Sequence, residues 1–201
     1  MCGIAGYIHF DKEKPASKDV VKNMTDTISH RGPDGEGIFI NKNLGLGHRR
    51  LSIIDLATGD QPMFSDDKSI ALIFNGEIYN YIELREELKS LGHTFRTTSD
   101  TEVIIHAYQE WGTNCQTKLN GCWGFAIWDN NEKLLFVSRD RLGEKPMHYS
   151  VWNNTFVFGS EIKSLFAFGV SDEKDLSLVE LYLFLKFIPA PFTFFKNIKK
   201  L

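Results

Sequence analysis

The sequence GCWGFAIWDNNEKLLFVSR, residues 121–139, decides the fold class. Two runs rich in aromatic and branched residues, 121–129 and 133–139, flank the polar residues Asp129 to Glu132. Strand-forming runs separated by such a turn predict a β-hairpin. Residues 147–152 and 155–159, around Asn153-Asn154, predict a second hairpin. Hairpins pair their strands antiparallel, so we expect antiparallel sheets.

Other segments add strands and helices to these hairpins. Apolar or alternating runs predict further strands at 3–9, 36–41, 45–53 and 69–75. Helices are predicted near 18–29, over 81–91 before Gly92, from the capping box Ser99 to Glu102 as far as Gly112, and from a second box at Ser177 to about 187. Strand hairpins combined with one-sided helices predict an α+β domain, with helices covering the outer faces of antiparallel sheets.

Composition excludes several classes of protein. With 42% apolar and 24% charged residues, a chain of 201 residues can bury a core and is not disordered. A net charge of -3 leaves no basic footprint for nucleic acid or an anionic membrane. The apolar stretch 181–195 contains Lys186, Pro189 and Pro191, so it predicts buried packing and no membrane helix. The N-terminus lacks the basic flank of a secretory signal, and we expect a cytoplasmic location.

Cys2 is the first candidate for chemistry. Removal of Met1 would leave its thiol beside a free α-amine, whose ordinary pKa of about 7.7 to 8.0 makes it a usable base near neutral pH. If Met1 stays attached, that base is an amide, and we expect a nearly inactive chain. Two alternatives are a small apolar residue that opens a buried strand, and a thiol hydrolase in which Cys2 pairs with a histidine.

Asn75 and Gly76 are the second candidate, at the expected end of the strand that precedes them. An Asn amide and a Gly backbone N–H there can both point at one developing oxyanion. The alternative is a plain turn, because Asn-Gly is a strong hairpin signal. Arg50, Glu77 and Asp100 supply a guanidinium and two carboxylates, which match the two ends of an amino-acid zwitterion. Asp100 has an alternative role as part of a helix cap.

Metal and nucleotide signatures are missing from the sequence. The three cysteines form no CxxC pair, and the six histidines show no metal-ligand spacing. The sequence contains neither a GxGxxG nor a GxxxxGK[ST] loop. We therefore expect no cofactor in this domain.

Taken together, these residues resemble the class II, or N-terminal nucleophile, glutamine amidotransferases, and specifically the glutaminase domain of the glutamine-hydrolysing asparagine synthetase family. The resemblance runs from Met1 almost to the end of the chain. The segments that carry it are MCGIAGY, HRGPDGEG, GHRRLSIIDLATGDQPM, FNGEIYNYIELREEL, SDTEVI, GCWGFAIWD, SRDRLGEKPMHY and SEIKSL.

The resemblance implies a four-layer αββα sandwich of two antiparallel sheets and a reaction at the side-chain amide of glutamine. Cys2 would be the nucleophile that forms a thioester and releases ammonia, with Asn75 and the Gly76 amide as the oxyanion hole. The implied substrate-binding residues are Arg50 for the carboxylate, Glu77 and Asp100 for the ammonium group, and backbone groups at Ile53 and Ile54. A non-catalytic glutamine-binding or regulatory module of the same fold is the competing hypothesis.

In this family a synthetase domain follows, with an SGGxDS loop that binds ATP, and ATP and Mg are expected only there. The sequence contains no such loop. Residues 1–201 would form the glutaminase domain, and those after about 170 would lead toward the synthetase domain. Phe192, Phe194 and Phe195 are expected to expose apolar surface for it. Glutamine and this domain are the implied partners, with a homodimer left open and neither nucleic acid nor membrane expected.

Overall fold

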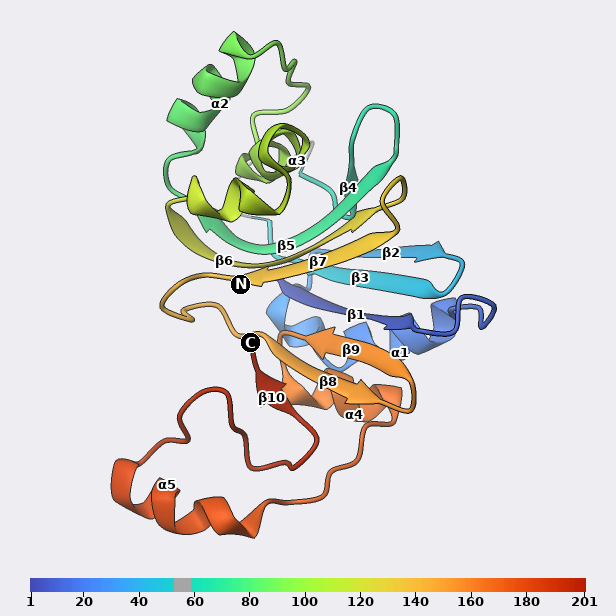
Figure 1. Ribbon diagram of the computed structural model, residues 1–201, viewed down its shortest axis with the longest axis vertical. Helices are drawn as coiled ribbons and strands as arrows, with labels where there is room; N and C mark the ends of the chain where they lie inside the picture. Colours follow the sequence, from blue (N-terminus) through green and yellow to red (C-terminus); the bar gives the residue numbers. More distant parts are fainter. Residues whose placement is uncertain (53–58) are drawn as a thin grey trace.

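A computed structural model describes residues 1–52 and 59–201 as two antiparallel sheets stacked face to face, with helices on their outer faces. Figure 1 shows α2 and α3 over one sheet, and α1 and α4 over the other. The predicted α+β class and the αββα layers are therefore confirmed.

The four-stranded sheet contains the hairpin that opened the sequence analysis, with one of its strands at the edge of the sheet. Its strands, in spatial order, are β4 (Met63–Phe64), β5 (Ile70–Ile78), β6 (Gly121–Asp129) and β7 (Leu134–Arg139). Helices α2 (Tyr81–Ser90) and α3 (Asp100–Trp111) cover its outer face. Leu72 and Phe74 of β5 are buried with residues of these helices, whereas Ala71 and Ile73 are buried between the sheets. Strands covered on both faces have near-continuous apolar sequences, as Ile70 to Phe74 does.

The six-stranded sheet carries the N-terminus of the chain. In spatial order its strands are β10 (Lys199–Lys200), β8 (His148–Trp152), β9 (Thr155–Gly159), β1 (Gly3–His9), β3 (Leu44–Arg50) and β2 (Gly35–Asn41). Helices α1 (Lys18–Asp26) and α4 (Ile162–Phe168) pack on its outer face, where Val21, Met24 and Leu165 are fully buried. Ile4 and Leu46 face inward and meet the other sheet. This inner layer places the start of β1 and the end of β3 beside β5.

Most predicted elements occur within a few residues of their expected bounds. The differences are that β5 runs on to Ile78, and that β4, β10 and α4 are present without having been predicted. Two of these three elements are only two residues long, too short for a periodic pattern to reveal. Gly92 and Gly112 end α2 and α3 with positive φ values, as the sequence suggested.

Helix α3 begins where the capping box predicted, but in the described part of the chain the hydrogen bonds expected of a capping box are not formed. Ser99 is the N-cap, but its hydroxyl accepts from the N–H of Thr101 at 3.1 Å. The Glu102 carboxylate does not return to Ser99; it accepts from the backbone of Arg96 and Thr97 at 2.9 and 2.8 Å. Burial of Glu102 against the preceding loop explains the difference, because the loop N–H groups also need acceptors. The second box is likewise replaced, since Asp175 accepts from the N–H of Ser177 and a short 3₁₀ turn (Leu176–Leu178) leads into α5 (Val179–Leu185).

The C-terminal segment departs from the expected buried packing. Helix α5 has no buried residue among its seven and lies at the end of the molecule opposite α2 and α3 (Figure 1). Phe184 is 84% exposed, and no residue of α5 belongs to the hydrophobic clusters that the described residues form in the sandwich. Phe192 is exposed as predicted, but Phe194 and Phe195 are partly buried, against Tyr182 and Phe166. Among the helices of residues 1–52 and 59–201, none has the length and apolarity that a membrane crossing requires.

Candidate active site

Six of the predicted site residues line one cavity of about 120 Å³ at the junction of the two sheets. The six are Cys2, Arg50, Asn75, Gly76, Glu77 and Asp100. Two further predicted residues, Ile53 and Ile54, lie outside the residues that the structure describes. Residues separated by up to 98 positions in the sequence therefore line one small cavity, which a role as a helix cap or a solvated surface charge would not require.

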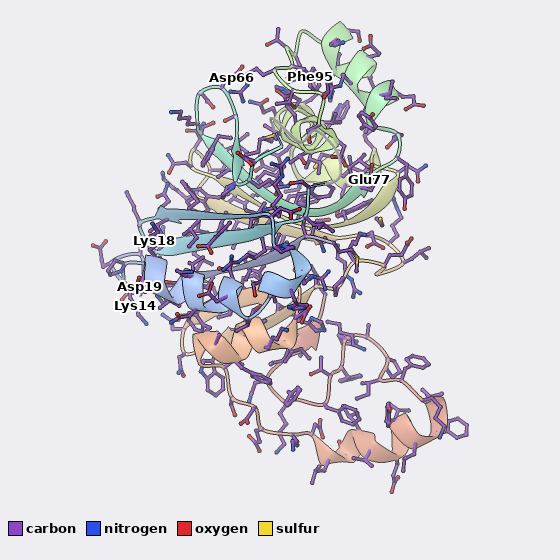
Figure 2. All side chains as sticks on the ribbon, turned by 180° about the vertical axis from the view of Figure 1, so that it is seen from behind. Lys14, Lys18, Asp19, Asp66, Glu77 and Phe95 are labelled. Carbon is purple, nitrogen blue, oxygen red and sulfur yellow. The ribbon has the colours of Figure 1, made fainter. Side chains whose placement is uncertain are left out.

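Four elements deliver these side chains. Cys2 precedes β1 and Arg50 ends β3, both in the six-stranded sheet. Asn75, Gly76 and Glu77 lie in β5 of the other sheet, and Asp100 is the first residue of α3. In Figure 2, Glu77 lies at the end of the four-stranded sheet opposite the loop that carries Asp66. The cavity thus opens where the ends of both sheets meet.

The Cys2 thiol is held by backbone atoms. Its Sγ lies 3.4 Å from the N–H nitrogen of Leu51 and 3.6 Å from the Leu51 carbonyl oxygen. Arg31 Nε donates to the Cys2 carbonyl at 2.9 Å, which anchors the N-terminal strand. In the described part of the chain these partners include no histidine, so the structure does not favour a Cys-His pair. Met1 lines the cavity, and its Sδ lies 3.6 Å from Lys145 Nζ.

Asn75 and Gly76 lie within a strand, so the expected strand end and the alternative turn are both wrong. They pair with Gly124 and Trp123 of β6. A Cβ at Gly76 would come within 2.2 Å of the Cys122 carbonyl oxygen, so the close approach of β6 requires glycine. The Asn75 side chain is only 2% exposed, and its Nδ2 has no hydrogen-bond partner among the described residues. Buried polar groups normally find partners, so this nitrogen is a donor open to an acceptor in the cavity.

The charged groups that line the cavity include two cations, Arg50 and Lys145, and two carboxyls, Glu77 and Asp100. Arg50 Nη1 donates to Asp60 Oδ1 at 2.7 Å, and this Asp60 side chain is 88% exposed. Burial raises the pKa of Glu77, the charge of Asp100 raises it further, and Lys145 lowers it. Burial also raises the pKa of Asp100, despite the hydrogen bond that its Oδ2 accepts from the N–H of Ile78 at 3.0 Å. Two adjacent carboxyls with raised pKa values favour a cationic ligand between them.

Sequence reasoning missed Gln61 and Lys145, which also line the cavity. Both stand in segments that carry the family resemblance, GHRRLSIIDLATGDQPM and SRDRLGEKPMHY, which was the available signal. Neither had a neighbour in sequence that suggested chemistry. Over the described residues, no group of three or more His, Cys, Asp or Glu side chains is arranged to hold a metal ion.

Comparison with known proteins supports the same family. The family model described as "Glutamine amidotransferase domain" matches residues 1–201. The chain is 42% identical to asparagine synthetase [glutamine-hydrolyzing] 1 of Bacillus subtilis (strain 168), over all of this chain and 32% of that protein. It is 43% identical to putative asparagine synthetase [glutamine-hydrolyzing] 2 of Methanocaldococcus jannaschii, over all of this chain and 42% of that protein.

Solved structures show the same fold at lower sequence identity. Glutamine phosphoribosylpyrophosphate amidotransferase from B. subtilis matches 84% of this chain and 44% of its own with a TM-score of 0.68 at 21% identity. The chain therefore spans less than half the length of these relatives. The full-length match to the family model, together with the two-sheet fold, shows that this chain belongs to the glutamine amidotransferase domain family.

Proposed function

We propose that this chain hydrolyses the side-chain amide of glutamine through a Cys2 thioester and supplies the ammonia to an amide synthetase. One observation carries the proposal: the thiol shares a cavity with an unpartnered buried amide donor, a guanidinium and two carboxylates. An acyl-transfer reaction needs the first two groups, and an amino-acid substrate needs the other three.

The proposed reaction begins when Met1 is removed and the Cys2 α-amine becomes free. That amine takes the thiol proton, and Sγ attacks the amide carbon of glutamine. The oxyanion that forms accepts hydrogen bonds from Asn75 Nδ2 and the Gly76 N–H. The protonated amine then gives its proton to the leaving nitrogen, which departs as ammonia. Water attacks the remaining thioester, releases glutamate and regenerates the thiol.

Substrate recognition follows from the charged groups that line the cavity. The glutamine α-carboxylate would pair with Arg50, in exchange for its contact with the exposed Asp60. The α-ammonium group would lie against Glu77 and Asp100, whose raised pKa values its charge would lower. The family resemblance alone suggests that backbone groups at Ile53 and Ile54 also line the pocket.

The acceptor of the ammonia is proposed from the relatives. Those relatives are named as glutamine-hydrolyzing asparagine synthetases and are longer than this chain. We propose asparagine formation at a C-terminal synthetase domain, where ATP and Mg would act, in the cytoplasm. Residues 1–201 would then be the glutaminase domain, with the part after about 170 leading toward the synthetase. The exposed apolar side chains of α5, which include Leu183 and Phe184, support a partner at that end of the molecule.

The test is glutamate release by chain whose terminus is verified as Cys2. Cys2→Ala and Cys2→Ser should abolish turnover while the folded structure stays intact, since Sγ makes only two weak backbone contacts in the described structure. A chain that retains Met1 should be nearly inactive although its thiol is present. If Cys2→Ala releases glutamate at the wild-type rate, the assignment is wrong. If the wild type binds glutamine without hydrolysing it, the chain is instead a regulatory module of this fold.

A further inference from the structure

Phe74, the residue before Asn75, lies where β5 loses one of its neighbours. Strand β4 pairs Met63 with Leu72, and continuing this antiparallel register would place Gln61 opposite Phe74. The ladder stops before that position, because β4 consists of Met63 and Phe64 only. The Phe74 backbone groups on that side therefore need partners other than a strand.

Two side chains take the place of the missing strand. Gln61 Oε1 accepts from the Phe74 N–H at 2.6 Å. His48 Nε2 donates to the Phe74 carbonyl at 3.2 Å, across the interface between the two sheets. The Phe74 carbonyl belongs to the same planar peptide group as the Asn75 nitrogen. Orienting that plane therefore orients the backbone from which the Asn75 side chain projects.

The histidine contributes little besides this hydrogen bond. It is 1% exposed, and burial lowers its pKa to about 3, so it is neutral near neutral pH. A carbonyl only accepts, so Nε2 carries the proton and Nδ1 is bare. Nδ1 is buried without a hydrogen-bond partner in the described structure. A hydrocarbon side chain would fill the site with no such unsatisfied nitrogen, so the bond to Phe74 is what histidine adds.

We propose that His48 and Gln61 are positioning residues: Gln61 holds the peptide before Phe74 by its N–H, His48 holds the peptide after Phe74 by its carbonyl, and together they aim the Asn75 amide and the Gly76 N–H at the reacting oxygen. This inference rests on the proposed function, in which those two groups are the oxyanion donors. His48 acts from a distance, through the Phe74 backbone. Because a displacement of about 1 Å in such a site can cost about 100-fold in rate, small rotations of these two peptide groups matter.

The first experiment separates positioning from general stability. His48→Leu should lower kcat for glutamate release by at least about 10-fold and change KM by less than about twofold, because oxyanion donors act mainly in the transition state. His48→Gln should restore much of kcat, since its amide can donate to the Phe74 carbonyl. His9→Leu is the matched control: His9 is also buried, and its Nδ1 lies 2.7 Å from Thr155 Oγ1, outside the cavity. Rates are normalised to thiol that iodoacetamide alkylates at Cys2.

Gln61 supplies an independent variant in case His48→Leu does not fold. Gln61→Met keeps the side-chain length without an acceptor, and it should also lower kcat more than it raises KM. Gln61→Glu keeps an acceptor oxygen and should retain more activity than Gln61→Met. A variant that raises KM and leaves kcat unchanged would assign Gln61 to substrate binding and overturn its positioning role.

A double-mutant cycle tests whether the effect passes through Asn75. In an Asn75→Ala background, His48→Leu should lower kcat by a clearly smaller factor than in the wild type, because one of the two donors that it positions is gone and only the Gly76 N–H remains. The same fold-loss in both backgrounds would overturn the proposal. An active Cys2→Ala would instead overturn the proposed function itself. An inactive Cys2→Ala together with wild-type kcat in His48→Leu would overturn only the positioning role.

Discussion

Asn75 illustrates what a single residue contributes to this molecule. A buried amide donor without a partner costs about 1–3 kcal/mol, so the fold holds this nitrogen at a loss. An oxygen that becomes negative in the cavity would satisfy the donor and recover that cost. The largest gain falls in the transition state, which is where catalysis requires it.

The roles of Asn75 and Arg50 predict opposite kinetic signatures. Asn75→Ala should lower kcat by about 100- to 1000-fold with little change in KM, because an oxyanion donor is lost. Arg50→Ala should raise KM for glutamine about 10- to 100-fold, because a charge-assisted pair is lost. Arg49→Ala is the matched control, since Arg49 follows His48 on the same strand but pairs with Asp26 and Glu36. If Asn75→Ala and Arg50→Ala lowered kcat equally and left KM unchanged, the assigned roles would be contradicted.

The two raised carboxyl pKa values predict a pH dependence of substrate affinity. An ammonium group binds ionised carboxylates, so protonation of Glu77 or Asp100 on the acid side should raise KM for glutamine. Burial raises the pKa of both groups, so the rise should begin at a higher pH than for ordinary carboxyls. KM should be measured as a function of pH for the wild type and Glu77→Gln. The variant should show a higher KM at neutral pH and a shallower dependence, whereas identical profiles would remove Glu77 from the ammonium site.

At the scale of the element, α3 is positioned by a carboxylate at its start. Glu102 is 1% exposed and accepts from the N–H groups of Arg96 and Thr97 and from the Thr97 hydroxyl. Burial raises the pKa of Glu102, but His106 and these donors outweigh it and bring the pKa down to about 2. The same helix begins with Asp100, so the loop contacts of Glu102 also locate one wall of the cavity.

Glu102→Ala should therefore destabilise the fold by about 2–4 kcal/mol, because three donors lose their acceptor. For a chain of this length that corresponds to a Tm lowered by roughly 4–16 °C. Glu86→Ala is the control: its ion pair with Lys89 lies on the surface of α2, and its loss should stay within about 1 kcal/mol. Denaturant unfolding measures both variants. Equal stability of the two would show that the Glu102 contacts contribute nothing beyond a surface pair.

At the scale of the whole molecule, we expect two histidines that are kept neutral, the buried His48 and the half-buried His148, to lower stability in acid. Burial lowers the pKa of His48 to about 3 and that of His148 to about 4. The unfolded chain takes up protons at these residues below about pH 6.5, whereas the native chain does so only near pH 3 at His48 and near pH 4 at His148. Between about pH 5 and 6.5 the unfolded state binds more protons, so stability falls as the pH falls.

Each of these histidines should contribute up to about 1.4 kcal/mol per pH unit in that window. Glu102, with its lowered pKa, adds a further loss only below about pH 4.5. Denaturant unfolding at several pH values should give a shallower slope for His48→Gln and for His148→Gln than for the wild type. Identical slopes in all three proteins would show that these histidines do not control acid stability.

The sequence by itself determined most of the elements and the α+β class. Hairpins at 121–139 and 147–159 follow from local residue pattern and turn chemistry, and the structure confirms them. Predictions from local pattern were wrong where a residue distant in sequence or in the preceding loop supplied the contact. Strand β5 continues through Asn75-Gly76 because β6 pairs with it. The Glu102 carboxylate accepts a hydrogen bond from the preceding loop, where a capping box was predicted. Helix α5 shows the converse, since its apolar residues suggested burial, whereas none of the seven is buried in the structure.

Part of the candidate site could be predicted from the sequence, and part of it is visible only in the tertiary structure. Residue chemistry singled out Cys2, Asn75, Arg50, Glu77 and Asp100, because each type suits acyl transfer or a zwitterion. Only the tertiary structure could bring them to one cavity, add Gln61 and Lys145, and leave the Asn75 amide without a partner. The reason is physical: proximity across two sheets and the burial that shifts each pKa are set by long-range packing, which no local sequence pattern encodes.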